Sequence, residues 1–476
     1  MVRSSRSRVC SILITAVALV AATSLTAVAA VSGGTAQPGF TTPVLLPGSD
    51  TFGEPSLNRA AGILYVTAPR GVLTSSTTDQ PSPVWLSTNG GASFQGPIVP
   101  SFAGVSQPLG GGDTDIISDA SGNVFQTDLW LGDTTMRVST DHGQTWVSNE
   151  LGSSSPGDDR PWLAYSAKDQ SLYVVYDGFD ALHVGRASLA AGPLGGIAFA
   201  QDVPAVPECL IGGQFLVRNN KPKVKLANPC FAGAPVTIRQ CVCPPGGIAV
   251  DPTTGSVYIT YSRQNGGAAG GGVGVARSDD LGLTWSYFSI PGTGSTGSAF
   301  DTEWNFAPVK IDSLGNVYVA WGELLGGSVK IRFAVSRDHG QTWSNPVTVS
   351  TSTATNVFPT MDLVASGSVD IAYYGTTTPG DPNAVNATWN VYLARSTNAL
   401  SALASFAPAM AVAGIHTGAI ESSNGTSDRS LLDLFQVVVD GGGKANIIYT
   451  AGQLGPPDPT TGLETRLTDL FFVKEL

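Results

Sequence analysis

The chain has 476 residues, of which 13% are charged, and it contains 57 glycines and 31 prolines. So few charged residues and so many turn-formers argue against a helical protein and favour an all-β architecture with a large core. The formal net charge of −11 at pH 7 argues against nucleic acid as a partner, because a phosphate backbone is bound by basic surfaces.

The first thirty residues have the layout of a secretory signal peptide. Three arginines precede an apolar run from Ile12 to Val20, and the segment ends in Ala27-Val28-Ala29. This layout predicts a signal peptide over residues 1–30 and a secreted, extracellular protein made of residues 31–476. No later stretch is apolar for long enough to cross a bilayer, so we expect no membrane span.

Four of the five cysteines lie within one short segment, at Cys209, Cys230, Cys241 and Cys243. Because export places thiols in an oxidising compartment, we expect these cysteines to form two disulfides, for which three pairings exist. The alternative is a structural metal site that uses the Cys-x-Cys pair.

An eight-residue pattern, Ser-x-Asp-x-Gly-x-Thr-Trp, recurs at residues 139–146, 278–285 and 336–343, with a weaker copy at 87–94. The Asp or Asn side chain can accept backbone N–H bonds in a tight turn, and the glycine supplies a left-handed backbone angle. The Trp or Phe can anchor the next strand. Each copy therefore predicts a hairpin turn. The pattern resembles the Asp-box, or BNR repeat, which marks sialidases and a wider set of β-propellers.

A longer unit of about fifty residues surrounds these boxes. It contains a strand, a Gly turn and a second strand in which Val alternates with Tyr, and it occurs at 55–67, 115–127, 161–176, 247–261, 307–321, 359–374 and 432–450. We therefore predict a seven-bladed β-propeller, with six blades as the alternative if residues 185–199 are only an insertion. The last unit lacks one strand, and residues 42–46 are predicted to supply it and close the ring.

Strand polarity predicts which face of the propeller carries a site. In a four-stranded meander the 1–2 and 3–4 turns share one face, here called the box face, and the 2–3 and 4–1 connections share the other, the top face. The boxes join strands 3 and 4, so we interpret their carboxylates as structural, and His142 and His339 as exposed turn residues. The longer connections, including a Cys-containing insertion at 200–245, lie on the top face, which becomes the default binding site.

Charged residues gather where the 4–1 connections enter the first strands, among them Glu54, Asp113 and Asp433. Carboxylates that crowd one concave site can have divergent pKa values, which suits acid/base catalysis. The predicted catalytic residues are Asp159 and Glu303, and the predicted substrate-binding residues are Arg160, Trp162, Trp304 and Arg429. The structural alternative is that these charges form ion pairs or hold Ca²⁺.

The resemblance to sialidase-like Asp-box propellers covers essentially the whole mature chain. It implies an exo-α-sialidase-like glycoside hydrolase that acts on sialylated or other extracellular glycans, works as a monomer, and needs no cofactor, with a structural Ca²⁺ left open. Family sialidases use six blades, an arginine triad, an Asp acid/base and a Tyr nucleophile activated by Glu, and Tyr373, Tyr374 and Tyr449 lie near second-strand ends.

This chain departs from the family pattern in one motif. Sialidases open with Phe/Tyr-Arg-Ile-Pro, whereas the equivalent first strand here begins Gly53-Glu54-Pro55-Ser56. The alternative function is therefore a non-catalytic extracellular propeller that binds a glycan, a peptide or a cell-wall polymer.

Overall fold

The structure is a computed structural model. It describes residues 31–69, 81–100, 110–130, 133–149, 152, 158–178, 181–207, 242–263, 272–293, 306–382, 384–420, 430–431, 433–454 and 466–476. Residues 31–476 form one compact unit. The predicted signal peptide and most of the cysteine segment lie outside the described residues.

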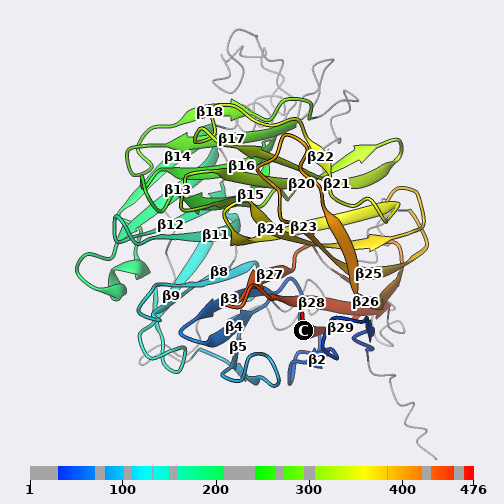
Figure 1. Cartoon of the computed structure of the whole chain (residues 1–476). Helices are drawn as coiled ribbons and strands as arrows, with labels where there is room; N and C mark the ends of the chain where they lie inside the picture. The colour runs from blue at the N-terminus through cyan, green and yellow to red at the C-terminus, as the bar shows by residue number, and fades with distance from the viewer. Residues whose placement is uncertain are drawn as a thin grey trace, which may run out of the picture. The chain divides into compact units, whose positions relative to one another are not determined.

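Seven antiparallel sheets make up this unit (Figure 1). The first contains β3 (Ser56–Ala60), β4 (Ile63–Thr67), β5 (Val84–Ser87) and β6 (Gln95–Ile98), and the second contains β7 (Thr114–Ser118), β8 (Val124–Trp130), β9 (Asp133–Ser139) and β10 (Val147–Asn149). The third contains β11 (Asp159–Ser166), β12 (Ser171–Asp177), β13 (Ala181–Ser188) and β14 (Gln201–Pro207), and the fourth contains β15 (Val242–Val250), β16 (Val257–Arg263), β17 (Gly272–Ser278) and β18 (Ser286–Ser289).

The remaining three sheets complete the set. The fifth contains β19 (Val309–Ile311), β20 (Val317–Leu325), β21 (Ser328–Ser336) and β22 (Val347–Thr348), and the sixth is built on β23 (Thr355–Ala365), β24 (Ser368–Thr376), β25 (Ala387–Ser396) and β26 (Ala407–Gly418). The seventh is built on β27 (Gln436–Val439), β28 (Ala445–Leu454) and β29 (Arg466–Lys474).

The first strands of successive sheets contact one another in chain order, and β27 returns to contact β3, so the ring is closed. The prediction of seven blades is confirmed. The degenerate segment at 185–199 is not an insertion, because β13 and the short 3-10 helix η2 (Pro193–Ile197) lead directly to the fourth strand of the third blade. Second strands such as Leu172–Tyr176 are buried throughout, as their β-branched and aromatic composition predicts for a blade packed between two neighbours.

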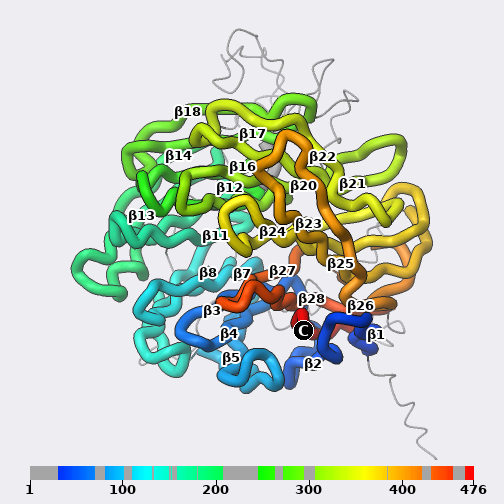
Figure 2. The backbone as a smooth tube through the Cα atoms, viewed as in Figure 1, coloured from blue at the N-terminus to red at the C-terminus, as the bar shows by residue number. Residues whose placement is uncertain are grey.

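The N-terminal segment closes the ring. Strand β2 (Val44–Leu45) pairs antiparallel with β29, with Val44 opposite Phe472, as the missing strand of the last blade requires. An additional strand, β1 (Thr35–Ala36), pairs with β26 and extends the sixth sheet, which the sequence did not predict. The same segment therefore covers the outer edges of the last two blades (Figure 2).

The box turns lie between the third and fourth strands, as predicted. In the second blade, Ser139 Oγ donates to Asp141 Oδ1 at 2.8 Å, and Asp141 Oδ1 accepts the Thr145 amide at 2.8 Å. The Trp146 indole donates to the Gly143 carbonyl at 3.1 Å. The boxes of the fourth and fifth blades repeat these bonds. Each box is thus a self-contained turn whose carboxylate is fully used by the turn.

The sixth blade contains a divergent box that the sequence pattern did not reveal. Ser396 Oγ donates to Asn398 Oδ1 at 3.1 Å, and the same oxygen accepts the Ser405 amide at 3.0 Å. The turn is longer than the other boxes and lacks their Gly and Trp, so only its hydrogen bonds identify it.

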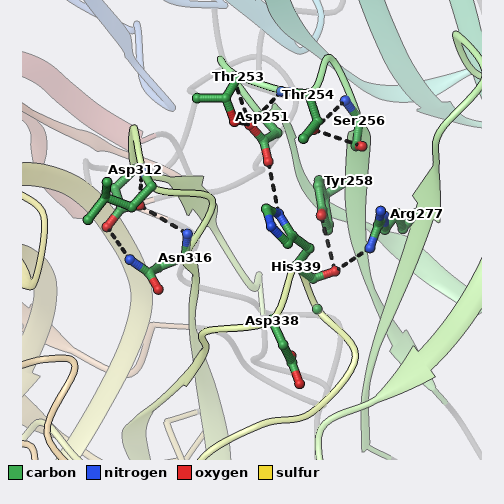
Figure 3. A network of polar contacts seen from close by, with 12 residues as sticks. Asp251, Thr253, Thr254, Ser256, Tyr258, Arg277, Asp312, Asn316, Asp338 and His339 are labelled. Carbon is green, nitrogen blue, oxygen red and sulfur yellow. Dashed lines mark hydrogen bonds and ion pairs between the residues drawn. The ribbon is translucent and has the colours of Figure 1, made fainter.

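The fifth-blade box also contacts the neighbouring fourth blade (Figure 3). His339 Nδ1 lies 3.2 Å from Oδ2 of Asp251, a fully buried carboxylate of the fourth blade. The His339 carbonyl accepts hydrogen bonds from Tyr258 at 3.1 Å and Arg277 at 2.9 Å. The expectation of an exposed turn residue is confirmed for His142 and is wrong for His339, which is half-buried because it joins the two blades.

Candidate functional site

The first strands of all seven blades surround a central channel of about 310 Å³. Part of its wall is polar: Ser56 Oγ donates to Asp115 Oδ1 at 2.6 Å, and Asp115 Oδ2 accepts the Leu163 amide at 2.8 Å. These bonds join the first strands of the first three blades. Asp115 is 5% exposed, and burial raises its pKa. We interpret Asp115 as a latch between blades.

Four non-glycine residues at the starts of first strands have left-handed backbone angles: Glu54 (φ +54°), Arg160 (+52°), Phe306 (+32°) and Phe358 (+55°). The strand register shifts around Arg160 and around Phe358, which marks β-bulges there. A bulge can re-aim a side chain, and each left-handed non-glycine residue costs roughly 1–3 kcal/mol unless its surroundings hold it. Such strain is concentrated at functional sites, so the top end of the channel is the first candidate.

Arg160 joins several of these strand starts. Its Nη2 lies 3.1 Å from Asp433 Oδ2, and its guanidinium lies 4.4 Å from the centroid of the Phe306 ring. The Asp433 amide donates to Glu54 Oε1 at 3.0 Å. Asp113 and Asp159 interact electrostatically with the same guanidinium. We call Glu54, Asp113, Asp159, Arg160 and Asp433 the axial cluster.

One carboxyl group of the axial cluster has a raised pKa. Burial first, and then the negative charge of Asp159, raise the pKa of Asp113 to about 6. Asp433 adds to this rise, while the charge of Arg160 opposes it. A hydrogen bond with the Glu54 side chain also opposes the rise in the Asp113 pKa, and two carboxyl groups can bond in this way only when one of them carries a proton. The pair can therefore release or accept a proton near pH 6.

The structure describes half of the six predicted catalytic and substrate-binding residues. Asp159 and Arg160 begin β11 and belong to the axial cluster, while Trp162 lines the channel and donates its indole N–H to the Pro245 carbonyl at 3.0 Å. The other predicted residues, Glu303, Trp304, Arg429, Cys209, Cys230 and Cys241, lie outside the described residues. Cys243 lies in β15, but its side chain is not described. The Asp159–Glu303 pair and the disulfides remain predictions.

Sequence reasoning missed the two phenylalanines at the strand starts. A signal existed for one of them: Phe358, like Glu54 and Arg160, directly precedes a proline at or near the start of a first strand. A residue before proline is conformationally restricted, so a repeated X-Pro at one place in the blade unit marks an unusual backbone there.

The tyrosines near second-strand ends do not suit nucleophilic catalysis. Tyr374 stacks on Phe435 with ring centroids 4.2 Å apart, and the Tyr449 hydroxyl donates to the Gly33 carbonyl at 2.6 Å. Burial raises the pKa of both phenols, whereas a nucleophilic phenol must lose its proton readily. These tyrosines are core residues.

No group of three or more His, Cys, Asp or Glu side chains within the described ranges is arranged to hold a metal ion. The structural Ca²⁺ remains a prediction. The described ranges also contain no helix with the length and apolar character needed to cross a membrane.

No family model and no curated protein matches this chain. Among solved structures, it is similar to a PL25 ulvan lyase bound to -[GlcA(1-4)Rha3S]- (TM-score 0.47, 11% identity, 94% of this chain and 96% of that one). It is also similar to the α-L-arabinofuranosidase Arb93A from Fusarium graminearum (0.44, 13%, 78% and 99%) and to a mutant Trypanosoma rangeli sialidase with trans-sialidase activity (0.39, 12%, 93% and 60%).

These three structures are named as carbohydrate-active enzymes, but identities of at most 13% and TM-scores of at most 0.47 assign no activity to this chain. The ring of seven sheets and the repeated box turns confirm the fold as a seven-bladed β-propeller.

Proposed function

We propose that this protein is a secreted, monomeric glycoside hydrolase that acts on extracellular glycans at the top end of its channel. The observation that carries the proposal is the Glu54–Asp113 pair, in which burial and the neighbouring Asp159 raise the pKa of Asp113 to about 6. A glycosidase needs one carboxyl group that is protonated at working pH and a second that is ionised. The axial cluster brings several carboxyl groups together, and the pKa of one of them, Asp113, is raised to about 6.

The roles follow from how the carboxyl groups are spaced. Glu54 and Asp113 are in hydrogen-bond contact, which is closer than the roughly 5–9.5 Å that separates the two carboxyls of a glycosidase. The pair therefore supplies one group, the general acid, and we assign that role to Asp113 because its pKa is raised to about 6. Asp159 supplies the second carboxyl group, and Glu303, the other catalytic residue predicted from the sequence, lies outside the described residues. Trp162 offers an aromatic surface in the channel wall.

A second candidate function is non-catalytic glycan binding. The ion pair between Arg160 and Asp433 joins the third and seventh blades, and a cluster that braces the ring in this way can serve a binding propeller equally well. Activity separates the two functions.

The test is a screen of the purified mature protein against fluorogenic sialosides and a panel of other glycosides, beside a glycan-binding array. We expect hydrolysis of at least one glycoside, with turnover reduced about a hundredfold or more in Asp113→Asn and Asp159→Asn, since an amide cannot transfer the proton. Asp141→Asn is the matched control, because the first-blade box already carries Asn89 at that position. Glycan binding without hydrolysis across the panel would favour the binding propeller.

A further inference from the structure

Arg160 is the residue around which the axial cluster is organised. We infer that Arg160 is a positioning residue: it gathers the Glu54–Asp113 pair and Asp159 into one cluster and keeps their shared proton exchangeable, and it does not bind a substrate carboxylate. This inference deepens the proposed function and rests on it for the link to turnover. The proton itself can be measured without any substrate.

The geometry leaves Arg160 little freedom to bind a ligand. Its backbone is held left-handed at the bulge that begins β11. Its guanidinium contacts the Asp433 carboxylate of the seventh blade and the Phe306 ring at the start of the fifth, and its side chain is 17% exposed. A guanidinium that recognises a substrate carboxylate presents both of its paired N–H groups to it. Here three blades fix the group before any ligand arrives.

The charges around Arg160 explain what it does instead. Burial disfavours the guanidinium charge, but the surrounding carboxylates outweigh this effect and raise the pKa of Arg160. The titratable groups facing it from the starts of four blades are Asp433, Asp113, Asp159 and Glu54. In return, the positive charge lowers the pKa of Asp113 and opposes the rise that burial and Asp159 cause. Without Arg160, the pair would hold its proton up to a higher pH.

The experiment is a carboxyl titration of the mature protein labelled with ¹³C at aspartate side chains, with the Asp113 signal assigned by its loss in Asp113→Asn. In Arg160→Gln we expect the Asp113 midpoint to rise from about 6 to about 7 or above, because a compensating positive charge is gone. Arg160→Lys should restore a midpoint close to that of the wild type. Arg277→Gln, which removes an arginine of the box face, is the control and should leave the Asp113 midpoint unchanged.

Two further results decide the inference. Asp433→Asn removes a negative charge, so it should move the Asp113 midpoint downward, in the direction opposite to Arg160→Gln. If Arg160→Gln fails to fold, the Asp433→Asn titration by itself tests the positioning role. An unchanged midpoint in folded Arg160→Gln, or shifts of the same sign in both variants, would overturn the positioning role.

Once a substrate is known, Arg160→Gln should shift the alkaline limb of the pH–rate profile upward while KM for a neutral glycoside stays within about threefold. A KM increase of ten- to a hundredfold with an unshifted profile would instead show Arg160 as a substrate ligand, the role predicted from the sequence. If no glycoside of the panel is hydrolysed, the proposed hydrolase function is wrong. The titration would still test whether Arg160 sets the Asp113 pKa.

Discussion

Arg160 Nη2 lies 3.1 Å from Asp433 Oδ2 and joins two blades that are not neighbours in the ring, the third and the seventh. Because the pair is largely buried at 17% and 11% side-chain exposure, loss of one partner leaves a charge poorly compensated. Most contacts in a propeller run between adjacent blades, so this pair is a brace across the top end of the channel.

The brace predicts a stability effect. Asp433→Ala should lower the free energy of unfolding by about 1–3 kcal/mol, since it leaves the Arg160 guanidinium without its closest carboxylate. Asp279→Ala is the matched control: the Arg277–Asp279 pair is 2.7 Å long but Asp279 is 59% exposed, so its loss should cost less than about 0.5 kcal/mol. Urea unfolding of both variants checks this, and equal losses would contradict the brace.

The axial proton predicts how stability depends on pH. Because the pKa of folded Asp113 is raised to about 6 from its ordinary 3.8, the folded protein binds more protons than the unfolded chain between these values. The stability from the protonated group is complete below about pH 4 and is lost as pH rises through about 6, by about 1–3 kcal/mol. Urea unfolding at a series of pH values from 4 to 7 measures this loss of stability. In Asp113→Asn this part of the pH dependence should disappear; its persistence would place the proton elsewhere.

The box turns predict graded effects of removing their tryptophans. Trp146 is 6% exposed and anchors its turn to the blade, so Trp146→Ala should cost about 3–5 kcal/mol. Trp285 and Trp343 are only partly buried, and their replacement should cost less. The thermal unfolding temperatures of the three Trp→Ala variants test this order. Leu283→Ala, at a 54% exposed position in the fourth-blade box, serves as the control and should melt like the wild type.

The C-terminus is held by Arg395. Its guanidinium contacts both oxygens of buried Asp370 at 2.6 Å and Glu475 Oε2 at 2.8 Å. Arg395→Met should destabilise the fold by about 3–5 kcal/mol, because it leaves the buried Asp370 carboxylate without its positive partner. Arg59→Met, at an exposed position, should be nearly neutral in the same denaturation assay. A stable Arg395→Met protein would show that strand pairing alone holds the last blade.

The cysteine segment predicts an intact-mass result. The unreduced mature protein should contain no free thiol and no zinc, because export favours two disulfides among its four cysteines. Thiol titration and elemental analysis measure both quantities. Four titratable thiols or one zinc per chain would show that the disulfide prediction is wrong and would support the structural metal site.

Much of the fold could be predicted from the sequence because it is encoded locally. The box at 139–146 forms its turn from its own side chains, and the alternation of Leu172 to Tyr176 marks a strand whatever packs against it. Closure by residues 42–46 also followed from the sequence, since a last blade that lacks one strand leaves an edge to be paired.

Tertiary structure alone decided the contents of the site. Arg160 and Asp433 are 273 residues apart, and Asp433 and Glu54 are 379 apart, so no local pattern records that they meet. Sequence composition indicated that carboxylates gather on the top face, but which of them shares a proton depends on burial and on the distance to one guanidinium. Both are properties of the closed ring, because seven strand starts converge only after the last blade has joined the first.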